Sequence, residues 1–282
     1  GWDTDPVFFM LFTSVILFVL FLIRERRSRD SLLQLGLFRY KAYIASALVA
    51  FIFGAGMFGS LYIIPVMVQT VQGVTALEAG LMLLPGGLVS LLVFPFAGRL
   101  STIIHPSYTM TIGLAIFAVS CWLLGGTGIL TTFWMMAFLI ALGRIGLGLV
   151  IPSLNLSAMS SVPNDLVPFA AGTMKFIRFT GASIGINTLA IIIDSKMIKY
   201  GSSLLETQTF NNSTTQEFLS NMSERLMNSG LTNVEGVIVS KAYLKNLLLL
   251  KAQESAFQDG YIALLMLFIL GMVATTIVFR KN

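Results

Sequence analysis

The stretch AGLMLLPGGLVSLLVFPFAGRLS, residues 79–101, decides the fold of this chain. It holds about 20 mostly apolar residues in succession, which suits a hydrocarbon core about 30 Å thick. Pro85 and Pro95 lie inside it, and prolines are tolerated in membrane helices because neighbouring helices and waters satisfy the freed backbone groups. We therefore expect a membrane helix that is broken at its prolines and turns sharply at Gly98-Arg99.

The composition of the whole chain points to the same class. Hydrophobic residues make up 56% of the 282 residues and charged residues only 11%, so a water-soluble domain is excluded. The net charge of +5 is confined to a few connections, so nucleic acid is not expected as a partner. Cys121 is the only cysteine and His105 the only histidine, and we therefore expect no disulfide, metal site or cofactor. The chain begins with Gly1 and not with methionine, which is compatible with a fragment of a longer protein.

Seven apolar stretches are long enough to cross a bilayer, and together they predict an all-α membrane protein with seven transmembrane helices. These stretches are residues 6–23, 42–67, 77–97, 107–125, 132–155, 168–193 and 257–279.

Basic residues are concentrated in alternate connections between these spans. They are Arg24, Arg26, Arg27, Arg29, Arg39, Lys41 and Arg99, with Arg280 and Lys281 at the carboxyl end. The intervening connections, residues 68–76 and 126–131, contain no lysine or arginine. The positive-inside rule then predicts a multi-pass protein of the plasma membrane with its amino end outside and its carboxyl end in the cytoplasm.

A long polar segment, residues 194–256, is predicted to lie on the outer side. Thr214 and Glu217 have the spacing of a capping box, and Gly230 suits the end of that helix. A second amphipathic stretch, residues 242–257, leads into the last span. We expect a small helical cap outside the membrane, with a solvated loop as the alternative.

Arg144 is the clearest candidate for a functional side chain. It lies about twelve residues into its span, roughly 18 Å from the outer end at 1.5 Å per residue. An ionised group at that depth is unfavourable by about 2.5–3.5 kcal/mol on insertion scales, which marks it as functional by default. Arg144 either lies in a wet cavity, where it pairs with a carboxylate or steers a substrate, or is satisfied by backbone carbonyls at a helix break. Gln69, Asn155 and Asn187 are weaker candidates for the same pathway, since polar side chains also join helices to one another.

A second group of residues suggests gating or packing. Gly181 and Gly185 form a G-x-x-x-G pattern, which is typical of closely packed membrane helices. Arg178 shares that face and either extends to the headgroups or takes part in an inner gate. Pro85, Pro95, Gly98 and Arg99 belong to the same functional class, because a broken span next to a basic turn suits a helix that moves.

Short pieces along the chain then resemble one known family. The pieces lie at residues 62–69, 76–87, 95–101, 146–152, 160–163, 178–185 and 256–261. Each is weak alone, but in this order they resemble the carboxyl-terminal half of the fourteen-helix drug:proton antiporters of the major facilitator superfamily, the EmrB/QacA type. The resemblance implies that residues 1–41 are a linking helix with a cytoplasmic loop, and that residues 42–282 are a six-helix carboxyl-terminal bundle.

The resemblance also implies an activity and its partners. It predicts efflux of amphiphilic or cationic small molecules in exchange for protons, by alternating access against an amino-terminal half that is missing here, within membrane lipid. The family's inner latch motif is degraded, with Thr102, Ile103 and His105 at the positions of its acid, base and glycine. No Asp or Glu lies in the middle of a span, so the proton carrier is expected elsewhere; the nearest, Glu78, belongs to a capping box with Thr75.

Two other functions compete with this one. A truncated half-transporter, acting as a partner subunit without transport of its own, has the same sequence features. A seven-helix receptor matches the number of spans and the orientation, but the last span carries no ligand-linking lysine. No enzyme motif of the G-x-S-x-G, H-E-x-x-H or P-loop type occurs, so an enzyme is not expected.

Overall fold

The computed structural model describes residues 5–27, 34–207, 212–228 and 232–279, which are helical almost throughout. Arg29, Gly230, Arg280 and Lys281, to which the sequence analysis gave roles, lie outside the described residues. The helices are α1 (Asp5–Arg27), α2 (Lys41–Val71), α3 (Ala76–Ile103), α4 (Pro106–Leu124), α5 (Phe133–Ser160), α6 (Val167–Glu206), α7 (Ser213–Asn228) and α8 (Asn233–Phe279), with short 3₁₀ turns η1 (Leu35–Arg39) and η2 (Asn164–Leu166).

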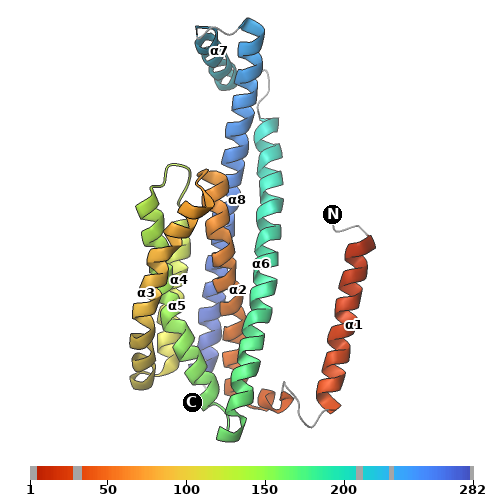
Figure 1. The fold of residues 1–282 in the computed structure, drawn as a ribbon, viewed down its shortest axis with the longest axis vertical. Helices are drawn as coiled ribbons and strands as arrows, with labels where there is room; N and C mark the ends of the chain where they lie inside the picture. The colour runs from red at the N-terminus through yellow and green to blue at the C-terminus, as the bar shows by residue number, and fades with distance from the viewer. Residues whose placement is uncertain (1–4, 28–33, 208–211, 229–231, 280–282) are drawn as a thin grey trace.

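Six of these helices, α2 to α6 and α8, are long and apolar enough to cross a membrane. The all-α membrane fold is therefore confirmed. α1 is helical over the first predicted span, but it stands apart from the bundle (Figure 1). Phe9, Phe12 and Leu17 on α1 are each more than half exposed, and no described residue of α1 belongs to the hydrophobic core. The seventh span stays a prediction.

The six long helices form one bundle (Figure 1). α5 packs between α3 and α4, α6 packs along α2, and α8 contacts α2, α4 and α6. Phe117 of α4 stacks on Phe268 of α8 with ring centroids 4.4 Å apart, and both side chains are buried in the core. The α2–α3 and α4–α5 connections lie at the end that is uppermost in Figure 1, which we call the upper end.

Pairs of serines join the helices in the lower half of the bundle. Ser46 of α2 hydrogen-bonds Ser157 of α5 at 3.0 Å, and Ser101 of α3 hydrogen-bonds Ser153 of α5 at 2.8 Å. All four side chains are buried. Small polar residues of this kind let membrane helices approach and bond to each other, so α5 is held to both α2 and α3.

α3 does not have the break that its prolines predict. Pro85 and Pro95 both lie inside one continuous helix. Each proline removes one backbone hydrogen bond, and the helix is nevertheless regular on both sides of each. The predicted break is therefore wrong; packing of α3 against α5 keeps the helix intact.

The sharp turn predicted at Gly98-Arg99 is also wrong, because α3 continues through both residues to Ile103. The chain turns at His105 instead. Pro106 is the first residue of α4, a position that suits its fixed φ, and His105 Nδ1 accepts a hydrogen bond from a backbone N–H of the first turn. The stop signal is thus the His-Pro pair and not the glycine.

Helix capping follows the sequence in one case and departs from it in another. The Thr75–Glu78 capping box is confirmed, with the Thr75 N–H donating to Glu78 Oε2 at 2.8 Å. The box predicted from Thr214 is wrong: Asn212 Oδ1 accepts from the Thr215 N–H at 3.3 Å. Asparagine is the stronger N-cap residue, so α7 begins two residues earlier than predicted, at Ser213.

The polar segment 194–256 is mostly helical. α6 continues to Glu206 and α8 already begins at Asn233, so both helices extend well beyond the upper end of the bundle, and α7 lies beside the tip of α8 (Figure 1). No proline occurs between residues 197 and 256 to end either helix. Gly201 of α6 leaves room for Leu249 of α8, and Phe218 of α7 stacks on Tyr243 of α8. We call this projection the arm.

Candidate functional site

Arg144 lies in the interior third of α5. It comes eleven residues after Phe133, so it is about 16 Å below the upper end of the helix. Its side chain is half-buried, and it forms no hydrogen bond or ion pair with any residue that the structure describes. A cation in this position needs a partner that the described bundle does not supply.

The space for Arg144 is provided by α3. A Cβ atom added at Gly86 would lie 2.8 Å from Arg144 Cγ and 3.3 Å from a methyl group of Ile140. The arginine stem therefore lies across the bare backbone of α3 at the residue that follows Pro85. Sequence reasoning missed the role of Gly86; the small residues of Pro-Gly-Gly at 85–87 were the available signal.

A glycine-rich stretch of α5 sets the direction in which Arg144 points. Gly143 and Gly146 face α4, where added Cβ atoms would collide with Ser120 and with the backbone of Gly113. Gly148 faces Val93 of α3. α5 therefore packs closely against both α4 and α3, and the Arg144 side chain lies against α3.

The other predicted pathway residues do not gather around Arg144. Gln69 is exposed near the upper end of α2 and donates to the Pro65 carbonyl of its own helix. Asn155 lies eleven residues below Arg144 on α5, about 16 Å away along the axis. Asn187 on α6 donates to the Ser183 carbonyl, again within its own helix. The four side chains are therefore spread along the depth of the bundle.

A polar stripe on α6 was not predicted from the sequence. Thr180, Ser183 and Asn187 follow helical spacing on one face, and all three are exposed. Thr180 and Asn187 donate to carbonyls four residues earlier, so their hydrogen bonds are satisfied locally. The spacing of three and four residues between polar side chains in an apolar span was the signal.

Gly181 and Gly185 lie against α2. A Cβ atom on Gly181 would meet the carbonyl oxygen of Phe51, and one on Gly185 would lie 2.5 Å from the Ala55 Cα. Gly54 of α2 is in the same position with respect to the Arg178 carbonyl. The two helices thus approach backbone to backbone along their crossing.

The side chain of Arg178 is half-buried next to this crossing. Its guanidinium lies 5.9 Å from the ring centre of Phe179, which packs in turn on Phe58 of α2. Arg99 is exposed near the lower end of α3, and Gly98 has open space around it. The predicted gating residues of α3 and α6 are therefore not in one cluster.

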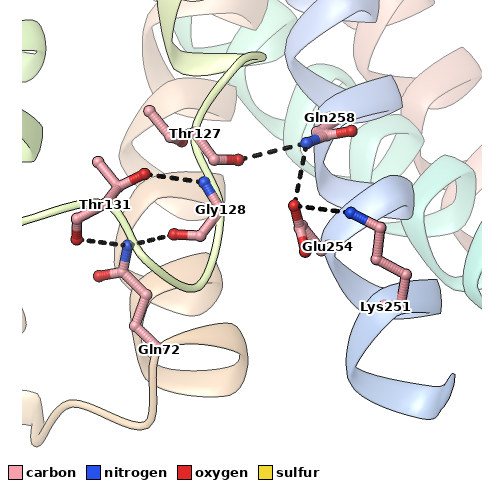
Figure 2. Close-up of polar contacts among 7 residues, drawn as sticks. All are labelled: Gln72, Thr127, Gly128, Thr131, Lys251, Glu254 and Gln258. Carbon is pink, nitrogen blue, oxygen red and sulfur yellow. Dashed lines mark hydrogen bonds and ion pairs between the residues drawn. The ribbon is translucent and has the colours of Figure 1, made fainter. Parts of the chain in front are cut away.

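Hydrogen bonds tie the upper end of the bundle together, as Figure 2 shows. Gln72, just after α2, donates to the carbonyl oxygens of Gly128 and Thr131 at 3.0 and 3.4 Å. The Gly128 N–H donates to Thr131 Oγ1 at 2.9 Å. These contacts connect α2 to the α4–α5 connection.

α8 holds the same connection from the other side (Figure 2). Gln258 donates to the Thr127 carbonyl and to Glu254 Oε1, both at 3.4 Å. Glu254 also accepts from Lys251 at 3.1 Å. α2, α4, α5 and α8 are thereby joined where the arm begins, so the base of the arm is a fixed part of the bundle.

The bundle, its intramembrane arginine and its glycine crossings define the class: a polytopic α-helical membrane protein. Within the described residues, no three His, Cys, Asp or Glu side chains come together in a way that would hold a metal ion. A sequence profile of the Major Facilitator Superfamily matches residues 5–186. This is more than half of the chain, and the chain belongs to that superfamily.

Its relatives include transporters and resistance proteins. The multidrug transporter protein MdtP of Bacillus subtilis (strain 168) is 24% identical over 196 residues, which are 70% of this chain and 36% of the relative. The lincomycin resistance protein LmrB of the same organism is 24% identical over 185 residues, 66% of this chain and 39% of LmrB. The methylenomycin A resistance protein of Streptomyces coelicolor is 25% identical over 203 residues, 69% of this chain and 41% of the relative.

These matches cover only part of each relative. The aligned region spans between 36% and 43% of the length of four curated relatives. The family and the relatives place this chain among membrane transporters.

Proposed function

We propose that this chain is the carboxyl-terminal half of a proton-coupled multidrug efflux transporter that works by alternating access. Residues 1–41 would link it to an amino-terminal half, and residues 42–282 would form the bundle that rocks against that half. Amphiphilic or cationic small molecules would be the substrates, and the membrane would be the plasma membrane.

The observation that carries the proposal is the uneven burial of the helices. In its most apolar window, α2 is 67% buried, whereas α3 and α6 are only 22% buried. These two helices also flank the polar groups that lipid does not suit: Arg144 beside α3, and the stripe of Thr180, Ser183 and Asn187 on α6. A second bundle over this part of the surface would cover both.

In that arrangement Arg144 would face the amino-terminal half. An unpaired cation would repel a cationic substrate, so we infer that Arg144 pairs with a carboxylate of the amino-terminal half. That carboxylate is also the natural proton carrier, since no Asp or Glu lies in the middle of a span of this chain. The drug and antibiotic names of the relatives support the substrate class.

Proton-driven efflux is the first expected result. Vesicles that contain the whole protein should expel a fluorescent cationic dye when a pH gradient is imposed, and a protonophore should abolish the effect. Dye transport that persists after the gradient collapses would contradict proton coupling. Transport by residues 1–282 alone would contradict the need for a second half.

The orientation of the bundle has its own test. A cysteine at Ser202, in the arm, should react with a membrane-impermeant maleimide in intact cells, whereas a cysteine at Thr102, near the lower end, should react only after lysis. Both native side chains are exposed, and Cys121 is buried and should stay unlabelled. The opposite labelling pattern would show that the arm is cytoplasmic.

A further inference from the structure

An apolar groove lies where α2, α6 and α8 meet. Its volume is about 260 Å³, and its walls include Phe51, Ala55, Ile192, Ala263 and Leu267. Thr188 is the one polar side chain in the lining. The groove follows α6 from Ile184 to Ile192, a length of about 12 Å at the rise of an α-helix.

The groove is open on one side and closed at its base. Ile184 is 51% exposed, whereas Leu189 and Leu264 are buried. The base forms where Gly185 brings α6 onto Ala55 of α2. The open side faces away from the bundle at a depth where apolar residues surround it, so the surroundings of the groove are hydrocarbon.

The upper end of the groove is bordered by two opposite charges. Lys196 lies one helical turn above Ile192, and Asp259 lies one turn above Ala263. Lys196 Nζ and Asp259 Oδ2 are 2.7 Å apart, and their side chains are 42% and 25% exposed. The Tyr200 hydroxyl donates to the same carboxylate oxygen at 2.8 Å.

This border has the composition of a membrane interface. Tyrosine and lysine are the residues that gather at headgroup level, with their apolar parts toward the hydrocarbon. Lys196 Nζ also lies 5.7 Å from the ring centre of Tyr200, so the two side chains are arranged together. This composition favours a position at headgroup level for the pair, with the groove beginning below it.

We propose that the groove binds one acyl chain of a zwitterionic phospholipid, with the phosphate on Lys196 and the headgroup amine on Asp259. The volume is below the range of pockets for drug-sized ligands, and a narrow apolar trough suits a single chain. The two charges at the border match a headgroup that carries both signs. An anionic headgroup would place its charge next to Asp259 without compensation.

Lipid retention by the purified protein tests the proposal. The protein is equilibrated with equal amounts of phosphatidylethanolamine and phosphatidylglycerol, and bound lipids are counted by native mass spectrometry. The wild type should retain one phosphatidylethanolamine in preference to phosphatidylglycerol. Lys196→Gln should weaken that preference about tenfold, as loss of a charge-assisted hydrogen bond does. Lys199→Gln, which removes an exposed charge three residues later, should leave the preference unchanged.

The groove itself is tested by filling it. Ala263→Trp and Thr188→Trp should each prevent retention of the lipid, and Ile198→Trp, on the exposed part of α6, should not. Two groove variants are used so that a folding defect in one leaves the other to decide. Equal retention in both groove variants and the wild type would overturn the proposal. An equal effect of Lys196→Gln and Lys199→Gln, or equal retention of both lipids by the wild type, would overturn the assignment of the headgroup.

Discussion

Gly181→Ala is expected to destabilise the bundle by about 3 kcal/mol or more, the upper part of the range for overpacked cores. The added methyl group would meet the carbonyl oxygen of Phe51, which belongs to the backbone of α2 and has no rotamer to change. The helices would have to separate along their whole crossing, where Gly185 and Gly54 make equally close contacts. Thermal unfolding of the purified protein in detergent, followed by circular dichroism, measures the effect.

Gly172→Ala is the matched control, because Gly172 lies on the same helix with open space around it. An alanine there removes a helix-interior glycine and should stabilise the protein by about 0.5–1 kcal/mol. The two substitutions are chemically identical, so their difference reports the α2–α6 contact alone. Equal stability of both variants would show that α6 does not pack on α2 in this way.

Arg144→Gln is expected to reduce transport on the order of 100-fold, the effect of leaving one partner of a buried charge pair without its counterion. The initial rate of dye efflux from vesicles that contain the whole protein is the measurement. Arg144→Lys should retain part of the activity, since the charge stays but the planar guanidinium is lost. The fold should survive, because Arg144 forms no hydrogen bond or ion pair with the described residues.

The control for this charge is Lys175→Gln, which removes a cation from an exposed position near the lower end of α6. It should transport at the wild-type rate. Gly86→Ala adds a further check, because its methyl group would displace the stem of Arg144 while leaving the charge in the protein. Full transport by Arg144→Gln would remove Arg144 from the substrate pathway.

Features that depend on neighbours in the chain were predictable. The Thr75–Glu78 capping box needs only four residues, and the structure has it. The spans of α2, α4 and α5 match the apolar stretches within a few residues, because each stretch must satisfy its own backbone in lipid. At Asn212 a local preference was misjudged, and the stronger capping residue prevailed.

Features that depend on packing were not predictable in the same way. Pro85 and Pro95 indicated a break, but contacts with α5 keep α3 continuous. The polar segment after α6 was predicted as a small helical cap, but its length as a continuation of α6 and α8 was not, because those helices lie against each other in the arm. The sequence did not indicate that Gly86 leaves room for Arg144, because that contact joins two residues of different helices.

The sequence by itself determined the class of this protein, the number of apolar stretches and the presence of one charge deep in the membrane. These features follow from the composition, because each helix that crosses a bilayer must be apolar and must satisfy its own backbone hydrogen bonds. Only the tertiary structure decided that α3 stays whole, that α6 and α8 continue into an arm, and that a groove below Lys196 and Asp259 opens toward lipid. These depend on which helix faces meet, and residues far apart in the chain settle that together.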